Sequence, residues 1–353
     1  MLRAIPELEE RGWRFAFWAP GPSELYEHLR GLGLRVSGAP RPVAYSWRGL
    51  RLPPGPLRRV AAFPAYLRAY RRALDATRPA LVHANSLTTL VEAAVARLSG
   101  IPTLFHVHEM VSPSRKGRAA AALVRLTATE LVAVSEASAA ALGDGATRPR
   151  IVYEGALSPP EVEPHRGDRE RTVVGTVGVI SRRKGSDLFV EAARRVRHTE
   201  DVEFRMIGAP TDPLDEAWAR EVLGQAREAG IAHQPRADVL DELRDWDVFV
   251  LPSRRDPFPI SLLEAMGAGL PVIGTRVDGI SEQVTPEAGI LVDPESPESL
   301  AAAILDLVSS PDRREQMGLA ARRRFLENFT VARQAEGLHR AYLAALGDRA
   351  VPG

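Results

Sequence analysis

The feature that most constrains the fold is an alternation of short apolar segments with helical patterns, which runs twice along the chain. Apolar segments at 81–84 and 103–107 belong to the first run, and those at 172–178 and 248–251 belong to the second. Strands that are apolar throughout and alternate with helices are typical of parallel sheets covered on both faces. The sequence therefore predicts an α/β protein with two Rossmann-like, doubly wound domains.

The domain limits follow from length and from one irregular segment. A chain of 353 residues exceeds what one ordinary core accommodates. Residues 155–171 are rich in Pro and charge without any period, which indicates a linker. We predict an N-terminal domain at 1–166, a C-terminal domain at 167–330, and a last helix at 331–353 that packs back on the first domain. Tandem sheets of this kind are expected to face each other across a ligand-binding cleft.

The amino-acid composition excludes several classes of site, and the charged residues are distributed unevenly along the chain. The chain has no cysteine, so disulfides, thiolate metal sites and a cysteine nucleophile are excluded. Residues 1–166 carry 22 Lys+Arg and 14 Asp+Glu, whereas the remainder carries 24 and 31. No apolar run approaches the ~18 residues of a membrane span, and the first residues are acidic rather than cationic. We expect a cytoplasmic protein, with peripheral association at the inner membrane face left open.

One stretch, Val248–Thr275, combines an apolar strand, a charged loop, a short helix, a Gly/Pro break and a second apolar strand. Asp256 lies in the loop and Glu264 on the helix, with the N–H groups of the helix start beside both. Free N–H groups and the helix dipole favour anions there. The stretch therefore predicts an anion site flanked by two carboxylates.

Several motifs in order give the chain a family resemblance. They are Phe105–Glu109 (FHVHE), Val132–Ser135 (VAVS), Gly178–Gly185 (GVISRRKG), Asp256–Pro259 (DPFP), Glu264–Met266 (EAM), Gly269–Ile273 (GLPVI), Gly279 and Glu282. With these motifs the chain resembles the family 4 retaining glycosyltransferases of GT-B fold, over about its whole length. Two carboxylates eight positions apart would say little alone, but they precede the Gly-x-Pro-Val-Ile strand in the order that is typical of this family.

The resemblance implies roles in the C-terminal domain. Donor binding is expected from Arg183, Lys184, Phe258, Pro259, Ile260, Ser261 and Glu264. The two cations and the N–H groups of Ile260 and Ser261 would hold the diphosphate of a UDP- or GDP-sugar. Glu264 would accept hydrogen bonds from the ribose. Such a site implies no metal and no cofactor.

The resemblance also implies two residues at the reacting sugar. Asp256 is expected beside the donor sugar without being a nucleophile, because the implied mechanism is a front-face displacement in which the leaving phosphate takes the acceptor proton. His108, at the end of a strand of the first domain, matches the family's histidine that contacts the donor sugar. We expect His106 to point to the opposite face from His108.

The sequence departs from the family pattern at four places. Asp256 is shorter than the usual glutamate, Pro259 replaces a glycine and presets the first turn of the helix, and Val179 replaces a phosphate-binding arginine, for which Arg182 or Arg183 would compensate. The chain also begins inside the family's first helix, without the preceding strand and glycine-rich turn. We therefore expect the C-terminal domain to fold well and the first domain poorly.

Three functions stay open at this point. The first is a glycosyltransferase that acts in cell-surface polysaccharide or glycolipid synthesis, with a glycan or glycolipid as acceptor. The second is a GT-B-shaped nucleotide-sugar epimerase, and the third is a non-catalytic or truncated nucleotide-sugar-binding protein. The basic segment Arg48–Arg72, with seven arginines and no acid, is either an acceptor or anionic-membrane contact or a solvated face. No nucleic-acid partner is expected.

Overall fold

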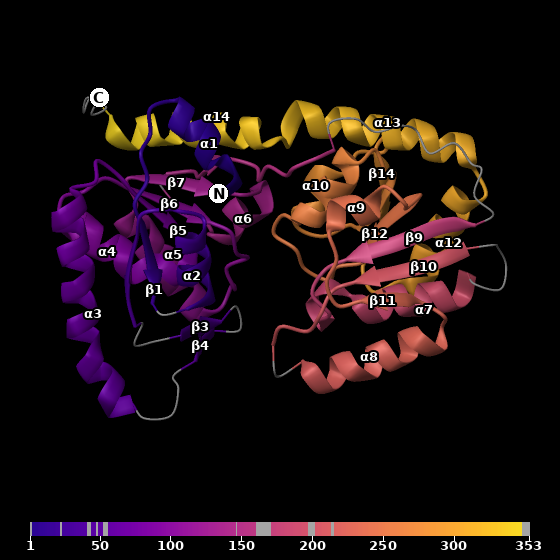
Figure 1. Ribbon diagram of the computed structural model, residues 1–353, viewed down its shortest axis with the longest axis horizontal. Coiled ribbons are helices and arrows are strands. Elements are labelled where there is room, and N and C mark those ends of the chain that lie inside the picture. The colour runs from indigo at the N-terminus through magenta and orange to yellow at the C-terminus, as the bar shows by residue number, and fades with distance from the viewer. Residues whose placement is uncertain are drawn as a thin grey trace. The chain divides into compact units, whose positions relative to one another are not determined.

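The computed structural model describes residues 2–21, 23–40, 44–46, 49–51, 56–145, 147–159, 171–196, 202–212 and 215–347. The chain forms two compact units (Figure 1). We call them the N-terminal unit (Met1–Val134, Ser138–Val152 and Ala335–Gly353) and the C-terminal unit (Ser135–Ala137 and Tyr153–Gln334). The second unit thus starts at Tyr153, earlier than the predicted limit after residue 166. The predicted linker falls largely outside the described residues.

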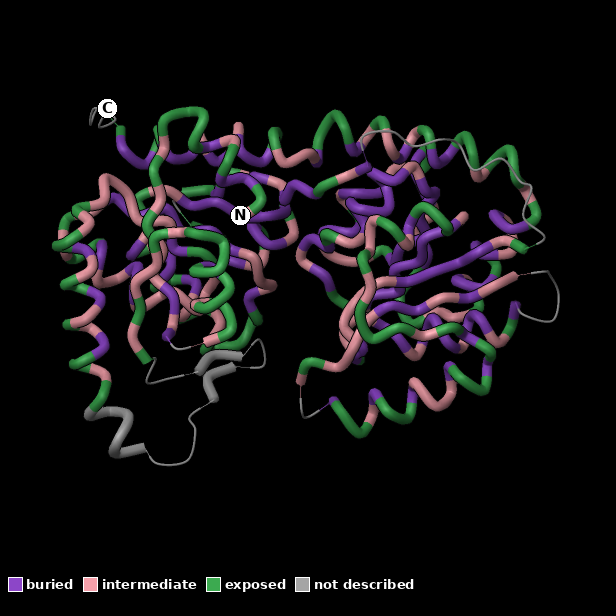
Figure 2. Tube along the Cα trace, viewed as in Figure 1, coloured by how far each residue is buried: buried purple, intermediate pink, exposed green. Residues whose placement is uncertain are grey.

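The C-terminal unit is built on one six-stranded sheet in the order β11-β10-β9-β12-β13-β14, and every pair of neighbours is parallel. Its central strands are buried, as the purple tube in Figure 2 shows. The order changes direction at β9 and β12, which makes this a doubly wound sheet. The strands are β9 (Thr172–Val177), β10 (Val202–Ile207), β11 (Ala232–Gln234), β12 (Val248–Leu251), β13 (Val272–Thr275) and β14 (Gly289–Val292).

Helices follow the strands of this unit in the expected alternation. One continuous core cluster joins the sheet to α7, α8 and α12, with Phe189 and Ile304 among its fully buried members. Helix α10 packs against α13 and against β12 and β13. The helices are η3 (Arg182–Lys184), α7 (Ser186–Val196), α8 (Glu216–Glu228), α9 (Val239–Leu243), α10 (Ile260–Gly267), α11 (Ile280–Gln283), α12 (Pro297–Val308) and α13 (Pro311–Asn328).

The described strands of the N-terminal unit form a parallel sheet in the order β5-β6-β7-β8, a separate parallel pair β1-β2 and an antiparallel hairpin β3-β4. Strand β6 is buried along its whole length, which matches its apolar sequence. The strands are β1 (Phe17–Pro20), β2 (Val36–Ala39), β3 (Ala44–Ser46), β4 (Gly49–Arg51), β5 (Val82–Asn85), β6 (Thr103–Val107), β7 (Glu130–Ala133) and β8 (Arg150–Ile151).

The helices of this unit come from both ends of the chain. Residues of α14 after Ala335 belong to it, and there Trp13 Nε1 donates to His339 Nδ1 at 2.9 Å while its ring meets that of Tyr342 edge-on. The helices are η1 (Leu2–Ala4), α1 (Ile5–Glu10), α2 (Glu24–Gly31), α3 (Pro56–Thr77), η2 (Leu87–Thr89), α4 (Leu90–Leu98), α5 (Arg115–Thr127), α6 (Glu136–Ala141) and α14 (Val331–Leu346).

Most elements lie where the sequence analysis puts them, with limits that shift by a few residues. The first strand starts at Phe17, and Trp13, which precedes it, packs on α14 instead of joining a sheet. Helix α3 starts at Pro56, since proline is tolerated in a first turn. Within the described part of the chain, no helix has both the length and the apolar character that a bilayer crossing needs.

Candidate functional site

The β12–α10–β13 stretch positions the main group of candidate residues. Strand β12 ends at Leu251, and the loop that follows leads to Ile260, where α10 begins. Pro259 occupies the cap position with an extended backbone (φ −72°, ψ 122°), so it precedes the helix and does not preset its first turn as expected. Its carbonyl accepts from Gln283 Nε2 at 3.1 Å. The described helix therefore starts one residue after the proline, on a fixed loop.

Asp256 lies at the centre of this loop and is buried, with 4% of its surface exposed. Its Oδ2 is 2.6 Å from Lys184 Nζ and 3.8 Å from Arg183 Nη1. Ser253 Oγ also donates to it, at 3.3 Å. A buried carboxylate needs compensation of this kind, because an unpaired charge in the interior is strongly destabilising. The structure thus brings Asp256 together with both predicted phosphate-binding cations.

Lys184 is held in place by the turn η3 and the residue after it. Ser181 Oγ caps this turn by accepting from the backbone N–H of Lys184 at 3.3 Å. Gly185 follows with φ 68°, and a Cβ there would lie 1.9 Å from the carbonyl oxygen of Pro252. Only glycine satisfies both the positive φ and this close approach. The lysine is therefore positioned by a glycine turn that packs directly on the Asp256 loop.

Arg254 fastens the same loop from its other side. Its guanidinium donates to both carboxylate oxygens of Asp187, at 2.7 and 2.8 Å, and to Glu295 Oε1 at 2.5 Å. It also donates to the carbonyl of Arg182 at 2.8 Å. The hydrogen bonds to Asp187 and then to Glu295 raise the pKa of Arg254 above its usual value, although partial burial lowers it. Arg254 is thus a structural cation that ties the loop to η3 and α7.

The structure separates the two arginines that could replace the missing phosphate-binding arginine at Val179. The Arg182 guanidinium lies over the ring of Trp218, 5.0 Å from its centroid. Arg183 instead approaches Asp256 and donates to the carbonyl of Arg255 at 3.0 Å. Of the two, Arg183 is the one beside Lys184 and Asp256.

A small pocket opens at the carboxyl end of β9, where Lys184 forms part of the wall. Carboxyl ends of parallel strands near the point where strand order reverses are the usual ligand sites of doubly wound sheets. The residues that line it are Thr176, Val177, Gly178, Val179, Ile180, Lys184, Ser186, Met206 and Leu251.

The start of α10 offers backbone donors without a competing acid. The first turn of this helix has no acidic residue and no side-chain cap. Ile260 is 37% exposed and Ser261 is partly buried. Glu264, one turn further, is 8% exposed and lies among Leu263 and Ala265, which are fully buried. The helix start can therefore take an anion, with a buried carboxylate one turn away.

Phe258 anchors the loop through an aromatic cluster. Its ring stacks on Tyr153, with centroids 5.0 Å apart and an interplanar angle of 7°, and meets Phe329 at 65°. Burial, followed by the nearby charge of Glu282, raises the pKa of Tyr153. This packing explains why Tyr153 belongs to the C-terminal unit. It also gives Phe258 a structural role in addition to the donor-binding role that we predict.

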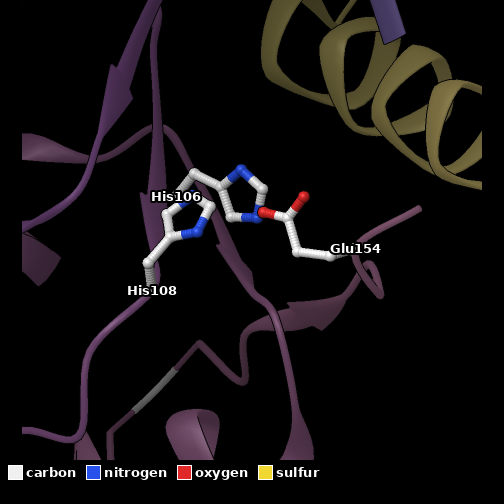
Figure 3. A group of neighbouring side chains, drawn as sticks. All are labelled: His106, His108 and Glu154. Atoms are coloured by element: carbon white, nitrogen blue, oxygen red, sulfur yellow. The ribbon is translucent and has the colours of Figure 1, made fainter. Parts of the chain in front are cut away.

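His108 lies in the N-terminal unit, one residue after β6, and its Nε2 is 2.9 Å from Asn85 Oδ1. The expectation that His106 points to the opposite face is wrong. The two rings are 4.1 Å apart, and Figure 3 shows them side by side; Glu154, also labelled there, belongs to the other unit. The side chains of residues i and i+2 of a strand share a face, so the two-residue spacing of His106 and His108 predicts the same face and not opposite ones. Burial lowers the pKa of His106 well below its usual value.

The sequence analysis missed two residues next to His108. Glu109 accepts from the N–H of Leu87 at 3.1 Å, from the N–H of His108 at 3.1 Å and from the hydroxyl of Ser86. Ser86 has φ 87° and ψ 152°, a conformation that residues with a Cβ rarely adopt and that costs about 1–3 kcal/mol. The adjacency of Glu109 to His108 was a usable signal, whereas the backbone of Ser86 carries none in the sequence.

Two family models match the chain consecutively. "Glycosyltransferase Family 4" matches residues 1–156, and "Glycosyl transferases group 1" matches residues 160–324. The chain belongs to the family 4 glycosyltransferases. Among curated relatives, it is 33% identical over 183 residues to the D-inositol 3-phosphate glycosyltransferase of Paenarthrobacter aurescens, a match that covers 50% of this chain and 44% of that protein.

Two further likenesses extend this result. The α-maltose-1-phosphate synthase of Mycolicibacterium smegmatis is 36% identical over 184 residues, covering 48% of this chain and 47% of the relative. The chain thus spans less than half the length of these two curated relatives. The crystal structure of Anabaena HepE in complex with UDP and glucose has a TM-score of 0.79 at 20% identity, covering 97% of this chain and 94% of that one. The α/β fold of this family 4 member is therefore GT-B.

Proposed function

We propose that this chain transfers a sugar from a nucleotide-activated donor to an acceptor hydroxyl, with retention of anomeric configuration. The observation that carries the proposal is the Lys184–Asp256 pair at the carboxyl end of the sheet, in which the carboxylate is buried and Arg183 lies next to it. Two cations beside a pocket and a helix start without acids are suited to a diphosphate. The names of the relatives and the UDP-bound neighbour agree with this chemistry.

In the proposed reaction the donor's bond between the anomeric carbon and the phosphate oxygen breaks, and a bond to the acceptor oxygen forms on the same face. The acceptor proton passes to the leaving phosphate. Lys184 and Arg183 stabilise the charge that develops on the diphosphate, which is the role that a metal would otherwise fill. We therefore propose a metal-independent reaction without a cofactor.

Asp256 is proposed to position the sugar and Lys184 rather than to attack. Its Oδ2 already binds Lys184 at 2.6 Å and accepts from Ser253, so its charge is largely compensated. A carboxylate with that surrounding is a weak nucleophile, whereas it is well suited to hold an ammonium group in place. Glu264 and the N–H groups of Ile260 and Ser261 complete the proposed donor site.

The two lysines of the chain allow a direct test of donor binding. Lys116 and Lys184 are its only lysines, so reductive methylation with a ¹³C label gives one dimethyl-lysine signal for each, plus that of the terminal amine. UDP or GDP should shift the Lys184 signal and leave that of Lys116, on α5, unchanged. Assignment comes from Lys184→Arg and Lys116→Arg. Equal shifts of the Lys184 and Lys116 signals, or no shift of the Lys184 signal with either nucleotide, would contradict the donor site.

Turnover then separates the candidate functions. With a panel of UDP-, GDP- and ADP-sugars, donor consumption should fall about 100-fold in Lys184→Ala, since a removed transition-state contact costs roughly this factor. Glu264→Ala should raise the donor KM, and Lys116→Ala serves as the matched control. An isomerised sugar released without acceptor would favour an epimerase, and binding without any turnover would favour a nucleotide-sugar-binding protein.

The proposed acceptor is a glycan or glycolipid of the cell surface, and the proposed location is the cytoplasm with peripheral contact to the inner membrane face. The support is the positive balance of residues 1–166 and the exposed arginines Arg68, Arg71 and Arg72 on α3. The rest of the Arg48–Arg72 segment lies partly outside the described residues. Co-sedimentation with phosphatidylglycerol vesicles, but not with phosphatidylcholine vesicles, would support this contact, and its absence in both would refute it.

A further inference from the structure

The carboxyl ends of β5 and β6 bring four polar residues together in the N-terminal unit. The strands are parallel neighbours, and Asn85 lies opposite His106 in their register. Asn85 ends β5, and His108 and Glu109 follow β6 directly. Ser86 continues the ladder by donating its N–H to the carbonyl of His106 at 2.8 Å. Side chains that leave both strand ends are therefore held in a fixed relation.

Glu109 locks this relation through backbone groups. Its carboxylate accepts from the N–H of His108 on its own segment, and from the N–H of Leu87 and the hydroxyl of Ser86 on the other. All three partners are donors, so the carboxylate acts only as an acceptor. The strained backbone of Ser86 is retained under these contacts, as such outliers are when their surroundings over-determine them. Strain of this kind is most often found where a side chain has to be aimed.

The group that is aimed is the imidazole of His108. Asn85 Oδ1 is 2.9 Å from His108 Nε2. An amide oxygen can only accept, so Nε2 carries the hydrogen, and in the neutral imidazole Nδ1 then carries the lone pair. The ring of His106 lies beside that of His108, with centroids 4.1 Å apart, and is fully buried; burial lowers the pKa of His106. His108 thus has an acceptor at Nε2 and a buried imidazole beside its ring.

We propose that Asn85 is a positioning residue that fixes His108 in its Nε2–H tautomer, so that Nδ1 is the atom that accepts a hydrogen bond from a sugar hydroxyl of the substrate. The tautomer follows from the structure of this unit alone. The role of Nδ1 toward a sugar rests on the proposed glycosyl transfer. The role of Asn85 was not visible in the sequence, where it is a polar residue between a strand and a Ser-Leu-Thr turn.

The position of Asn85 makes the test practicable. It is exposed at the end of its strand, so its replacement does not open the core. Asn85→Leu keeps the approximate size and removes the acceptor, and Asn85→Asp keeps an acceptor at the same place. Comparing these two variants separates the effect of the hydrogen bond from the effect of changing the side chain.

Long-range ¹H–¹⁵N correlation spectra of the imidazoles report the tautomer directly, and loss of a signal in His108→Gln assigns it. The wild type and Asn85→Asp should show a protonated Nε2 and an unprotonated Nδ1. Asn85→Leu should show a mixture of tautomers. A wild-type His108 protonated at Nδ1, or a spectrum that Asn85→Leu leaves unchanged, would overturn the proposal.

Steady-state kinetics test whether the hydrogen bond from His108 to Asn85 matters for turnover. Asn85→Leu should lower kcat about tenfold, which is the worth of one hydrogen bond, with the donor KM changed less than about twofold. Asn85→Asp should restore most of kcat. If the wild type turns over no donor, the proposed function fails while the spectra still decide the tautomer. If the wild type is active and Asn85→Leu has the same kcat, the positioning role fails alone.

Discussion

The two units use parallel sheets in different ways. In the C-terminal unit six strands form one sheet, and a single core cluster runs from α7 through β10 to α12. In the N-terminal unit the described strands are divided among three sheets, and its core includes two separate clusters, one around Phe105 and one around Tyr70. The described strands of the C-terminal unit thus share one sheet, whereas those of the N-terminal unit are divided among three.

The difference extends to how the candidate residues are held. In the C-terminal unit the Asp256 loop is fixed by a salt-bridge network and by Gly185 on a well-packed sheet. In the N-terminal unit His108 is fixed by a few hydrogen bonds at two strand ends, around Glu109 and Asn85. The two sites are thus held by different kinds of contact, so they should respond differently to mutation.

The largest expected effect tests the continuity of the cores. Phe189→Ala and Phe105→Ala each remove a fully buried ring, so each should destabilise its unit by roughly 3–5 kcal/mol. Hydrogen exchange should rise in all central strands of the C-terminal unit with Phe189→Ala. With Phe105→Ala it should rise in β5 to β8 and much less in β1 and β2. An equal rise in β1 and β2 would show that the N-terminal core is continuous after all.

The next effect concerns Gly185, where backbone conformation and space act together. Gly185→Ala should cost about 2–4 kcal/mol, because the residue has φ 68° and its Cβ would collide with the carbonyl of Pro252. Gly230 is the matched control, since it has φ 73° but no atom within 4 Å of a Cβ. Gly230→Ala should cost about 1 kcal/mol. Urea unfolding of both variants measures the difference, and equal losses would mean that the loop moves freely.

A third effect is a pH dependence confined to the N-terminal unit. The pKa of buried His106 is lowered from 6.5, so the unfolded chain binds a proton that the folded one does not. Stability should therefore be full above about pH 6.5 and fall as the pH drops below it, by at most ~1.4 kcal/mol per pH unit.

The control for this dependence is His106→Phe, which keeps an aromatic ring and removes the titration. The free energy of unfolding of this variant should change less between pH 7 and pH 5 than that of the wild type. Hydrogen exchange in β5 to β7 measures both. An unchanged slope would show that His106 is protonated in the folded unit.

The smallest effect separates two adjacent arginines in the C-terminal unit. Arg254 is 24% exposed and binds Asp187 with two hydrogen bonds, whereas Arg255 is 58% exposed and pairs with Asp278. Arg254→Ala should cost about 1–2 kcal/mol and Arg255→Ala less than about 0.5 kcal/mol. Thermal unfolding at low and high salt measures both, and an equal cost would mean that the Asp187 pair contributes no more than a surface contact.

The sequence predicted the C-terminal unit better than the N-terminal one, for physical reasons. Buried strands such as β6 and β12 are predicted correctly to the residue, because burial on both faces leaves few polar positions. Short edge strands such as β8 and β11 were missed, since two or three residues carry no period. The Asp256 loop was recognised from contiguous motifs, but its pairing with Lys184 joins residues 72 positions apart.

The N-terminal site shows the other limit of sequence reasoning. His108 was found through its motif, yet the hydrogen bond to Asn85 depends on strand register, and the positive φ of Ser86 occurs at a residue with no preference for it. His106 was misplaced although the strand period alone would have placed it correctly. The roles of the donor-site residues remain predictions that the variants above address.

The division of α14 has a consequence for the order of events during synthesis. Its residues up to Gln334 belong to the C-terminal unit, and those from Ala335 onward, with buried Leu338 and Tyr342, belong to the N-terminal unit. Domains usually fold in the order of translation. Here the N-terminal unit cannot be complete until α14 has been synthesised, because Trp13 contacts His339 on that helix. The C-terminal unit can therefore be complete first.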